Sequence, residues 1–131
     1  MKQLSLIIII ATTGFIMFNI FSKTTEVNVS IDHFKEMIEK ERGIVIDVRT
    51  KQEYNAGHLK ITDAQYDFLN GEFQDQIENF DKNKTYYLYC RTGNRSGQAA
   101  RIMQNEGFKN VFNVGGFEEL AEAGFDANMS E

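Results

Sequence analysis

Cysteine is almost absent from this sequence, because Cys90 is the only one among its 131 residues. A single cysteine can form no disulfide within the chain and cannot build a cysteine-cluster zinc site. We expect no metal and no organic cofactor. Proline and tryptophan are missing altogether, yet 42% of the residues are hydrophobic, as in an ordinary globular protein. The length suits one domain with a real hydrophobic core.

Basic residues are also in short supply. Fourteen Lys and Arg face nineteen Asp and Glu, which gives a formal net charge of −5 at pH 7. Binding to nucleic acid needs clustered basic side chains that neutralise phosphates. We therefore expect no nucleic-acid partner, and any local positive charge in this chain stands out.

The N-terminus differs from the rest of the chain. Lys2 is followed by an uncharged, mostly apolar stretch over residues 4–21, which is typical of an export signal. This stretch has no polar face, which argues against a helix packed in a folded core. Its 18 residues are near the lower limit for a membrane span, so a cleaved signal peptide and an uncleaved signal anchor both stay open. We expect residues 1–24 to be the signal and residues 25–131 the mature domain, exported to the periplasm or another extracytoplasmic space. The membrane is a partner only through an uncleaved signal.

The mature chain alternates between strand and helix patterns. The predicted strands are residues 27–29, 44–48, 85–89 and 111–114, with residues 57–65 a loop that holds at most a short strand. The first predicted helix follows Ser30, has its apolar residues at Ile31, Phe34 and Ile38, and lies in a region that ends at Gly43; the other predicted helices are residues 51–56, 72–79, 96–106 and 117–123. Ser30 is a candidate N-cap, Thr50 and Glu53 form a capping-box pattern, and Gly107 closes a helix. Such alternation over one small domain predicts an α/β fold with a mostly parallel sheet.

The single cysteine stands where the strand at residues 85–89 passes into the next helix. In a parallel sheet, ligand sites form outside the carboxyl ends of the strands. Backbone N–H groups of the loop and of the helix N-terminus should point toward the Cys90 sulfur. Arg91 and Arg95 add positive charge, and Gly93 lets the loop turn sharply. These features should lower the pKa of the thiol below its ordinary value of about 8.5.

A cysteine at a strand end is commonly a small buried core residue. Here the six residues after Cys90 include no large apolar side chain, which a core position would not have. We therefore predict that Cys90 is a nucleophile.

Three stretches of the chain together resemble the single-domain rhodaneses. They are Cys90-Arg91-Thr92-Gly93-Asn94-Arg95-Ser96, which is similar to that family's active-site loop; Ile46-Asp47-Val48-Arg49 with Glu53, Tyr54 and Gly57-His58-Leu59; and Val111-Phe112-Asn113-Val114-Gly115-Gly116-Phe117. The resemblance covers roughly residues 27–125. It implies the rhodanese-like three-layer domain, with a central, mostly parallel five-stranded sheet flanked by helices.

The resemblance also implies a function. A sulfurtransferase of this family moves sulfane sulfur from thiosulfate or a persulfide donor to a thiol or cyanide acceptor, through a cysteine persulfide. Cys90 would be the nucleophile. The residues that would cradle the transferred sulfur are Arg91, Thr92, Gly93, Asn94 and Arg95. Ser96 would cap the helix, and Asp47 and Arg49 would form a structural ion pair. We expect a monomer.

His58 could be taken for a base that acts on the cysteine. The resemblance implies that the Gly-His-Leu segment is a structural turn, so we leave His58 outside the catalytic set. The chain departs from the family pattern at residues 60–64, where Pro-Gly is usual, and at Leu120, where a tryptophan is common.

Three other functions fit parts of the sequence. A cysteine phosphatase places an arginine six positions after its cysteine, where this chain has Ser96; Arg95 comes one residue earlier. A non-catalytic rhodanese-like binding domain typically lacks the cysteine that this chain keeps. A redox carrier would need an external partner, because the chain has no second cysteine to resolve a disulfide.

Overall fold

The computed structural model describes residues 26–130, so the predicted export signal lies outside the described residues. In chain order the elements are α1 (Ile31–Lys40), β1 (Ile44–Asp47), α2 (Lys51–Ala56), β2 (Gly57–Leu59), β3 (Ala64–Gln65), α3 (Glu72–Gln76), the 3-10 helix η1 (Ile77–Asn79), β4 (Thr85–Cys90), α4 (Asn94–Asn105), β5 (Asn110–Gly116), α5 (Phe117–Glu122) and β6 (Ala127–Met129). Within the described range, no helix is long and apolar enough to cross a membrane.

Four parallel strands form the central sheet in the order β3-β1-β4-β5. The predicted α/β fold with a mostly parallel sheet is confirmed, but the predicted count of five strands is wrong. Residues 27–29 contribute only one parallel bridge, from Asn28 to Asn113 of β5. Because Ser30 already caps α1, the segment is too short to build a ladder. β2 and β6 form a separate antiparallel pair.

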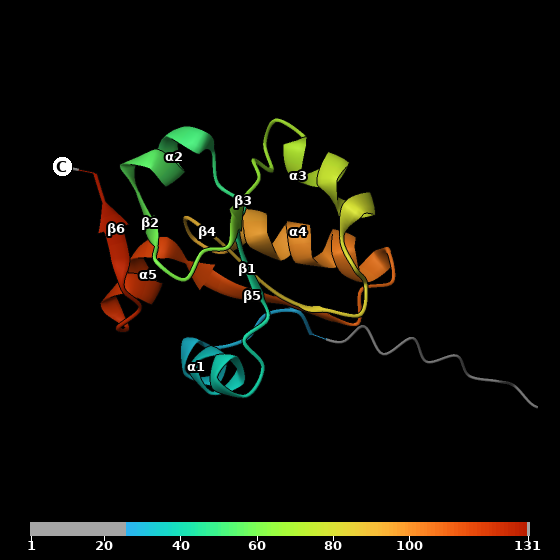
Figure 1. Ribbon diagram of the computed structural model, residues 1–131, viewed down its shortest axis with the longest axis horizontal. Coiled ribbons are helices and arrows are strands. Elements are labelled where there is room, and N and C mark those ends of the chain that lie inside the picture. The colour runs from blue at the N-terminus through green and yellow to red at the C-terminus, as the bar shows by residue number, and fades with distance from the viewer. Residues whose placement is uncertain (1–25, 131) are drawn as a thin grey trace, which may run out of the picture.

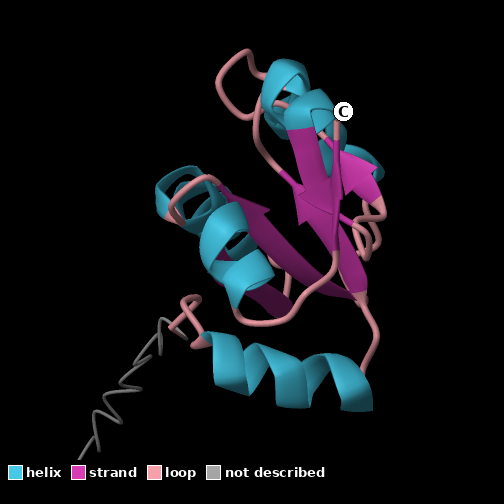
Figure 2. Cartoon of the chain, turned by 90° about the vertical axis from the view of Figure 1, so that its left-hand side faces the viewer, coloured by secondary structure: helices cyan, strands magenta, loops and turns pink. Residues whose placement is uncertain are grey.

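The sheet separates two hydrophobic cores. Side chains alternate between its faces, so Leu88 and Cys90 of β4 face the core that holds Met103 of α4, whereas Tyr89 faces the core that holds Phe34 of α1. Figure 1 shows α4 and α1 on opposite sides of the strands, and Figure 2 shows α1 across the bottom of the domain, apart from the other helices. The domain therefore has three layers, and the Cys90 side chain lies on the α4 side.

Several helix ends form as their sequences predict. Ser30 caps α1, and Thr50 and Glu53 make a complete capping box at α2. Gly107 follows α4 with a φ of +96°, a left-handed conformation that glycine adopts without strain. The capping box matters for the site because it fixes Glu53 at the start of α2, beside the loop that follows β4.

Candidate active site

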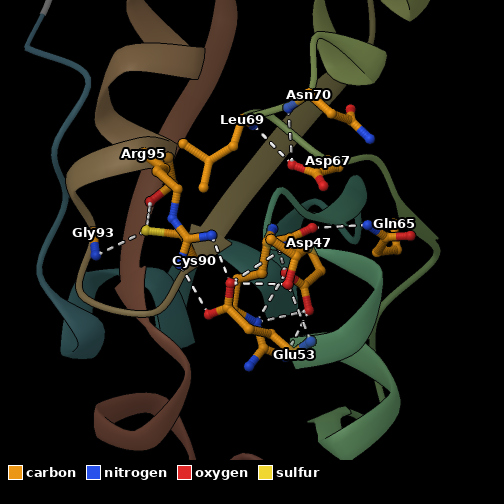
Figure 3. A network of polar contacts seen from close by, with 12 residues as sticks. Asp47, Glu53, Gln65, Asp67, Leu69, Asn70, Cys90, Gly93 and Arg95 are labelled. Atoms are coloured by element: carbon orange, nitrogen blue, oxygen red, sulfur yellow. Dashed lines mark hydrogen bonds and ion pairs between the residues drawn. The ribbon is translucent and has the colours of Figure 1, made fainter.

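Cys90 is the last residue of β4, and its side chain is fully buried. Among the groups that donate hydrogen bonds to its sulfur are the backbone N–H of Gly93 at 3.1 Å and the hydroxyl of Ser96 at 3.3 Å. Figure 3 shows the sulfur with these two contacts, between the end of β4 and the start of α4. The loop thus supplies an N–H donor to the sulfur, as predicted, and the first turn of the helix adds an O–H donor that was not predicted.

The environment lowers the pKa of the Cys90 thiol below its ordinary value. Burial works in the opposite direction, because a thiolate is poorly solvated in the core. Hydrogen bonds from the Ser96 hydroxyl and from the backbone amides of Ser96, Thr92 and Gly93 outweigh it. The predicted direction is confirmed, but its main cause is hydrogen bonding rather than the charges of the two arginines.

Arg95 is bound to an acidic partner. Its guanidinium donates two hydrogen bonds to the carboxylate of Glu53, at 2.7 and 2.9 Å. The Arg95 guanidinium lowers the pKa of Glu53 to about 2. This bidentate pair joins α2 to the sulfur loop and leaves little of the Arg95 charge free for a ligand.

Of the other loop residues, one contacts the sulfur and three are exposed at the outer edge, or rim, of the loop. Gly93 touches the sulfur through its amide, and its φ of +94° is one that glycine adopts readily. Arg91, Thr92 and Asn94 are exposed at the rim, and Asn94 accepts a hydrogen bond from Gln98 at 2.7 Å. Arg91 forms no ion pair within residues 26–130, so its charge is available to a ligand.

Ser96 does not cap α4, and that prediction was wrong. The helix begins two residues earlier, at Asn94, and Gly93 occupies the N-cap without a side-chain hydrogen bond. Because the left-handed Gly93 turns the chain directly into the helix, Ser96 lies inside the first turn and is fully buried. Its hydroxyl faces the Cys90 sulfur and lies 2.7 Å from Oδ1 of Asn113.

Asp47 and Arg49 form a buried ion pair at the end of β1. Nη2 of Arg49 lies 2.7 Å from Oδ2 of Asp47, and the two side chains are 5% and 0% exposed. Burial acts to lower the pKa of Arg49, and the hydrogen bond and charge of Asp47 outweigh it and raise that pKa. Arg49 also donates to the Gly57 carbonyl at 2.6 Å and lies 4.5 Å from the ring centroid of Phe117. The pair thus joins β1 to β2 and α5.

Asn113 belongs to the site although its sequence context did not single it out. Its Oδ1 accepts from Ser96 and from the Gly115 amide at 3.2 Å, and its Nδ2 donates to Oδ1 of Asn28 at 2.8 Å and to the Gly93 carbonyl at 3.0 Å. The available signal was a carboxamide flanked on both sides by apolar residues of a strand, because a buried polar side chain needs partners.

His58 lies apart from the sulfur contacts. Its ring stacks on Tyr54 with centroids 3.8 Å apart, and its Nδ1 is 3.0 Å from the Tyr54 carbonyl oxygen. Within residues 26–130, no three His, Cys, Asp or Glu side chains gather into a group that could hold a metal ion.

Two hollows border the sulfur loop. One, of about 650 Å³, includes Thr92, Gly93 and Arg101 in its lining. Another, of about 320 Å³, sets Arg91 beside the apolar side chains of Phe117 and Met129. The lining of this second hollow also includes the acidic residues Glu53 and Glu118.

Comparison with known proteins places this loop in a family. Residues 30–123 match the rhodanese-like domain. The thiosulfate sulfurtransferase GlpE of Pseudomonas putida is 34% identical over 96 residues, which cover 73% of this chain and 84% of GlpE. YrkF of Bacillus subtilis is 31% identical over 87 residues, and the match spans 66% of this chain but only 45% of YrkF.

A solved structure agrees with the sequence relatives. The structure of a rhodanese with anions from E. coli superposes with a TM-score of 0.56 at 29% identity, over 66% of this chain and 98% of that one. The family match extends from the N-cap of α1 to the end of α5 and includes the whole loop around Cys90. The chain therefore belongs to the family of rhodanese-like domains.

Proposed function

We propose that this domain is a sulfurtransferase that accepts sulfane sulfur on Cys90 from thiosulfate or a persulfide donor and passes it to a thiol or cyanide acceptor. The observation that carries the proposal is the Cys90 sulfur, buried and hydrogen-bonded by the Gly93 amide and the Ser96 hydroxyl. These donors favour the thiolate, which is the nucleophilic form of cysteine. The names of relatives such as GlpE agree with this chemistry.

The first step forms a persulfide. The Cys90 thiolate attacks the outer sulfur of thiosulfate, a new S–S bond forms, and the S–S bond of the donor breaks as its electron pair leaves with sulfite. The negative charge then lies on the terminal sulfur of the persulfide. The loop amides stabilise this charge in the way that an oxyanion hole stabilises a developing anion.

The second step returns the enzyme to its starting state. Cyanide or a thiolate attacks the terminal sulfur, and the electron pair of the breaking S–S bond returns to Cys90. With cyanide the product is thiocyanate. Thiolate is consumed in the first step and regenerated in the second, so the cycle needs no external oxidant or reductant.

Two features favour sulfur transfer over phosphoryl transfer. Ser96 stands at the position where a cysteine phosphatase has its arginine, and it is buried against the sulfur. Arg95 is held by the carboxylate of Glu53 and is not free to bind a phosphoryl group. The retained and hydrogen-bonded cysteine likewise favours an enzyme over a non-catalytic binding domain.

The test is turnover of thiosulfate and cyanide to thiocyanate and sulfite by the purified protein. We expect turnover by the native protein and none by Cys90→Ser, because the hydroxyl is a far weaker nucleophile and leaving group. An aryl phosphate serves as the competing substrate. Thiocyanate production that survives Cys90→Ser, or robust phosphate release, would overturn the proposal.

A further inference from the structure

We propose that Asn113 is a positioning residue whose carboxamide holds in place two of the groups that donate hydrogen bonds to the Cys90 sulfur, the Gly93 amide and the Ser96 hydroxyl. Its Oδ1 lies 2.7 Å from the Ser96 hydroxyl, and its Nδ2 donates to the Gly93 carbonyl at 3.0 Å. Asn113 touches no reacting atom, so it acts through Gly93 and Ser96. The inference rests on the proposed role of Cys90 as the nucleophile.

The fold gives Asn113 this position. It pairs with Leu88 across β4 and β5, so it lies on the α4 side of the sheet, the side that Cys90 also faces. The register then shifts, so that the next pair is Tyr89 with Gly115. At this irregularity the Gly115 amide turns to Oδ1 of Asn113 at 3.2 Å. The irregular pairing of β4 and β5 thus frees a backbone amide, that of Gly115, to hold the Asn113 side chain.

The orientation of the carboxamide follows from its contacts. Nδ2 meets two acceptors, the carbonyl of Gly93 and Oδ1 of Asn28, while Oδ1 meets the amide donor of Gly115. The reversed orientation would set a donor against a donor at Gly115. Asn113 is only 8% exposed, so its Oδ1 is a fixed acceptor for the hydroxyl of Ser96.

This fixed acceptor suits both charge states of the cysteine. The Ser96 hydroxyl has one proton and two acceptors, the Cys90 sulfur at 3.3 Å and Oδ1 of Asn113 at 2.7 Å. Beside a thiol, the S–H can donate to Ser96 while the hydroxyl donates to Asn113. Beside a thiolate, the hydroxyl proton turns to the sulfur, and Asn113 keeps the Gly115 amide as its donor. The exchange between the two acceptors thus requires rotation of the Ser96 O–H bond.

A neutral substitution at residue 113 leaves the surrounding charges unchanged. The charged groups around the sulfur are Arg91 beside it in sequence, Arg95 of α4, Glu53 of α2, and Asp47 and Arg49 at the end of β1. A shift in the thiol titration of Asn113→Ala therefore reports on hydrogen bonding to the sulfur.

The experiment is a pH titration of the purified full chain by the ultraviolet absorbance of the thiolate. Each variant is paired with its own Cys90→Ser form as the blank. We expect Asn113→Ala to raise the thiol pKa by about one unit, which means about tenfold less thiolate at pH values below both pKa values. Asn113→Asp should raise it further, because its carboxylate adds a negative charge near the sulfur. Asn79→Ala makes the same change in η1, where the side chain donates to Gln76 at 3.5 Å, and should leave the titration unchanged.

The rate of persulfide formation supplies a second readout. For Asn113→Ala it should fall about tenfold near neutral pH and recover above the raised pKa, whereas a general loss of folding would lower it at every pH. If Asn113→Ala does not fold, Asn28→Ala removes only the outer anchor of the carboxamide and should give a smaller shift in the same direction.

An unchanged or lower thiol pKa in folded Asn113→Ala or Asn28→Ala protein would overturn the inference. The titration requires no turnover, so its result is separate from the fate of the proposed function. A native protein that forms no persulfide would overturn the sulfurtransferase proposal alone.

Discussion

The Cys90 sulfur receives its hydrogen bonds from neutral groups, the Gly93 amide and the Ser96 hydroxyl. Nearby positive charge contributes less to stabilising the Cys90 thiolate, because the guanidinium of Arg95 is bound to the Glu53 carboxylate. The Gly93 amide is a fixed dipole that stabilises an anion without reorganising when it forms, whereas the Ser96 hydroxyl has only to rotate its O–H bond. In the proposed persulfide the single negative charge lies on the terminal sulfur, one bond beyond the Cys90 sulfur, where other amides of the same loop would stabilise it.

Replacing Ser96 by alanine tests this account at the level of one hydroxyl. We expect Ser96→Ala to raise the thiol pKa by about one unit, because a hydrogen bond to a charged group is worth roughly 1.5–3 kcal/mol. The rate of persulfide formation near neutral pH should fall about tenfold and recover at higher pH. A pH–rate profile measures both effects.

Ser30→Ala is the matched control for this substitution. It removes the N-cap hydroxyl of α1 and should cost about 1 kcal/mol of stability without moving the thiol pKa. If the two serine variants had the same thiol titration, the Ser96 hydroxyl would have no special part in holding the thiolate.

Among the elements, α2 is tied to the sulfur loop by the pair of Glu53 and Arg95. The pKa of Glu53 is about 2 in the folded protein and about 4.5 ordinarily. The pair therefore contributes its full stability above about pH 4.5 and loses it as the pH falls toward 2. We expect Glu53→Gln to lower the free energy of unfolding at neutral pH by roughly 1–2 kcal/mol, since the pair is partly exposed.

Urea denaturation at several pH values checks this dependence. The difference between the native protein and Glu53→Gln should shrink between pH 4.5 and 2. For the control Glu36→Gln, at an exposed position of α1, the free energy of unfolding should depend on pH as it does in the native protein. A constant difference for Glu53→Gln across this range would contradict the linkage.

We expect the ion pair of Asp47 and Arg49, at the end of β1, to contribute to the free energy of unfolding rather than to the chemistry at Cys90. Asp47→Asn leaves the buried guanidinium of Arg49 without its carboxylate, and such a loss typically costs about 3–5 kcal/mol. Arg42→Gln breaks a pair with Asp63 whose side chains are 52% and 42% exposed, and should cost about 1 kcal/mol or less. Chemical denaturation of both variants gives the comparison, and equal costs would show that burial of the first pair is not decisive.

Local signals in the sequence predicted most elements but not the contacts between distant ones. The apolar run of β1 and the capping box at Thr50 depend on neighbouring residues, and both formed as expected. The start of α4 was misplaced because the left-handed Gly93 caps it without a side-chain signature. β6 was missed because it pairs with β2 far back in the chain. Asn113 was missed for the same reason, since its carboxamide partner, Asn28, is 85 residues away.

At the scale of the whole molecule, we propose that residues 1–24 export the domain. The support is the apolar stretch after Lys2, with no acidic residue before Glu26. Expression of the full chain in a bacterium with two membranes, followed by fractionation, should place the protein outside the cytoplasm. Deletion of residues 2–24 should keep it inside, and the apparent size of the exported form distinguishes a cleaved signal from an anchor. A full chain that stays soluble in the cytoplasm would contradict export.

The most direct test of the central claim is the intact mass of the protein after incubation with thiosulfate. We predict a gain of one sulfur atom on the native protein, its removal by cyanide with release of thiocyanate, and no gain on Cys90→Ser. A native protein whose mass never changes, or a Cys90→Ser variant that gains the same mass, would contradict the assignment of Cys90 as the sulfur carrier.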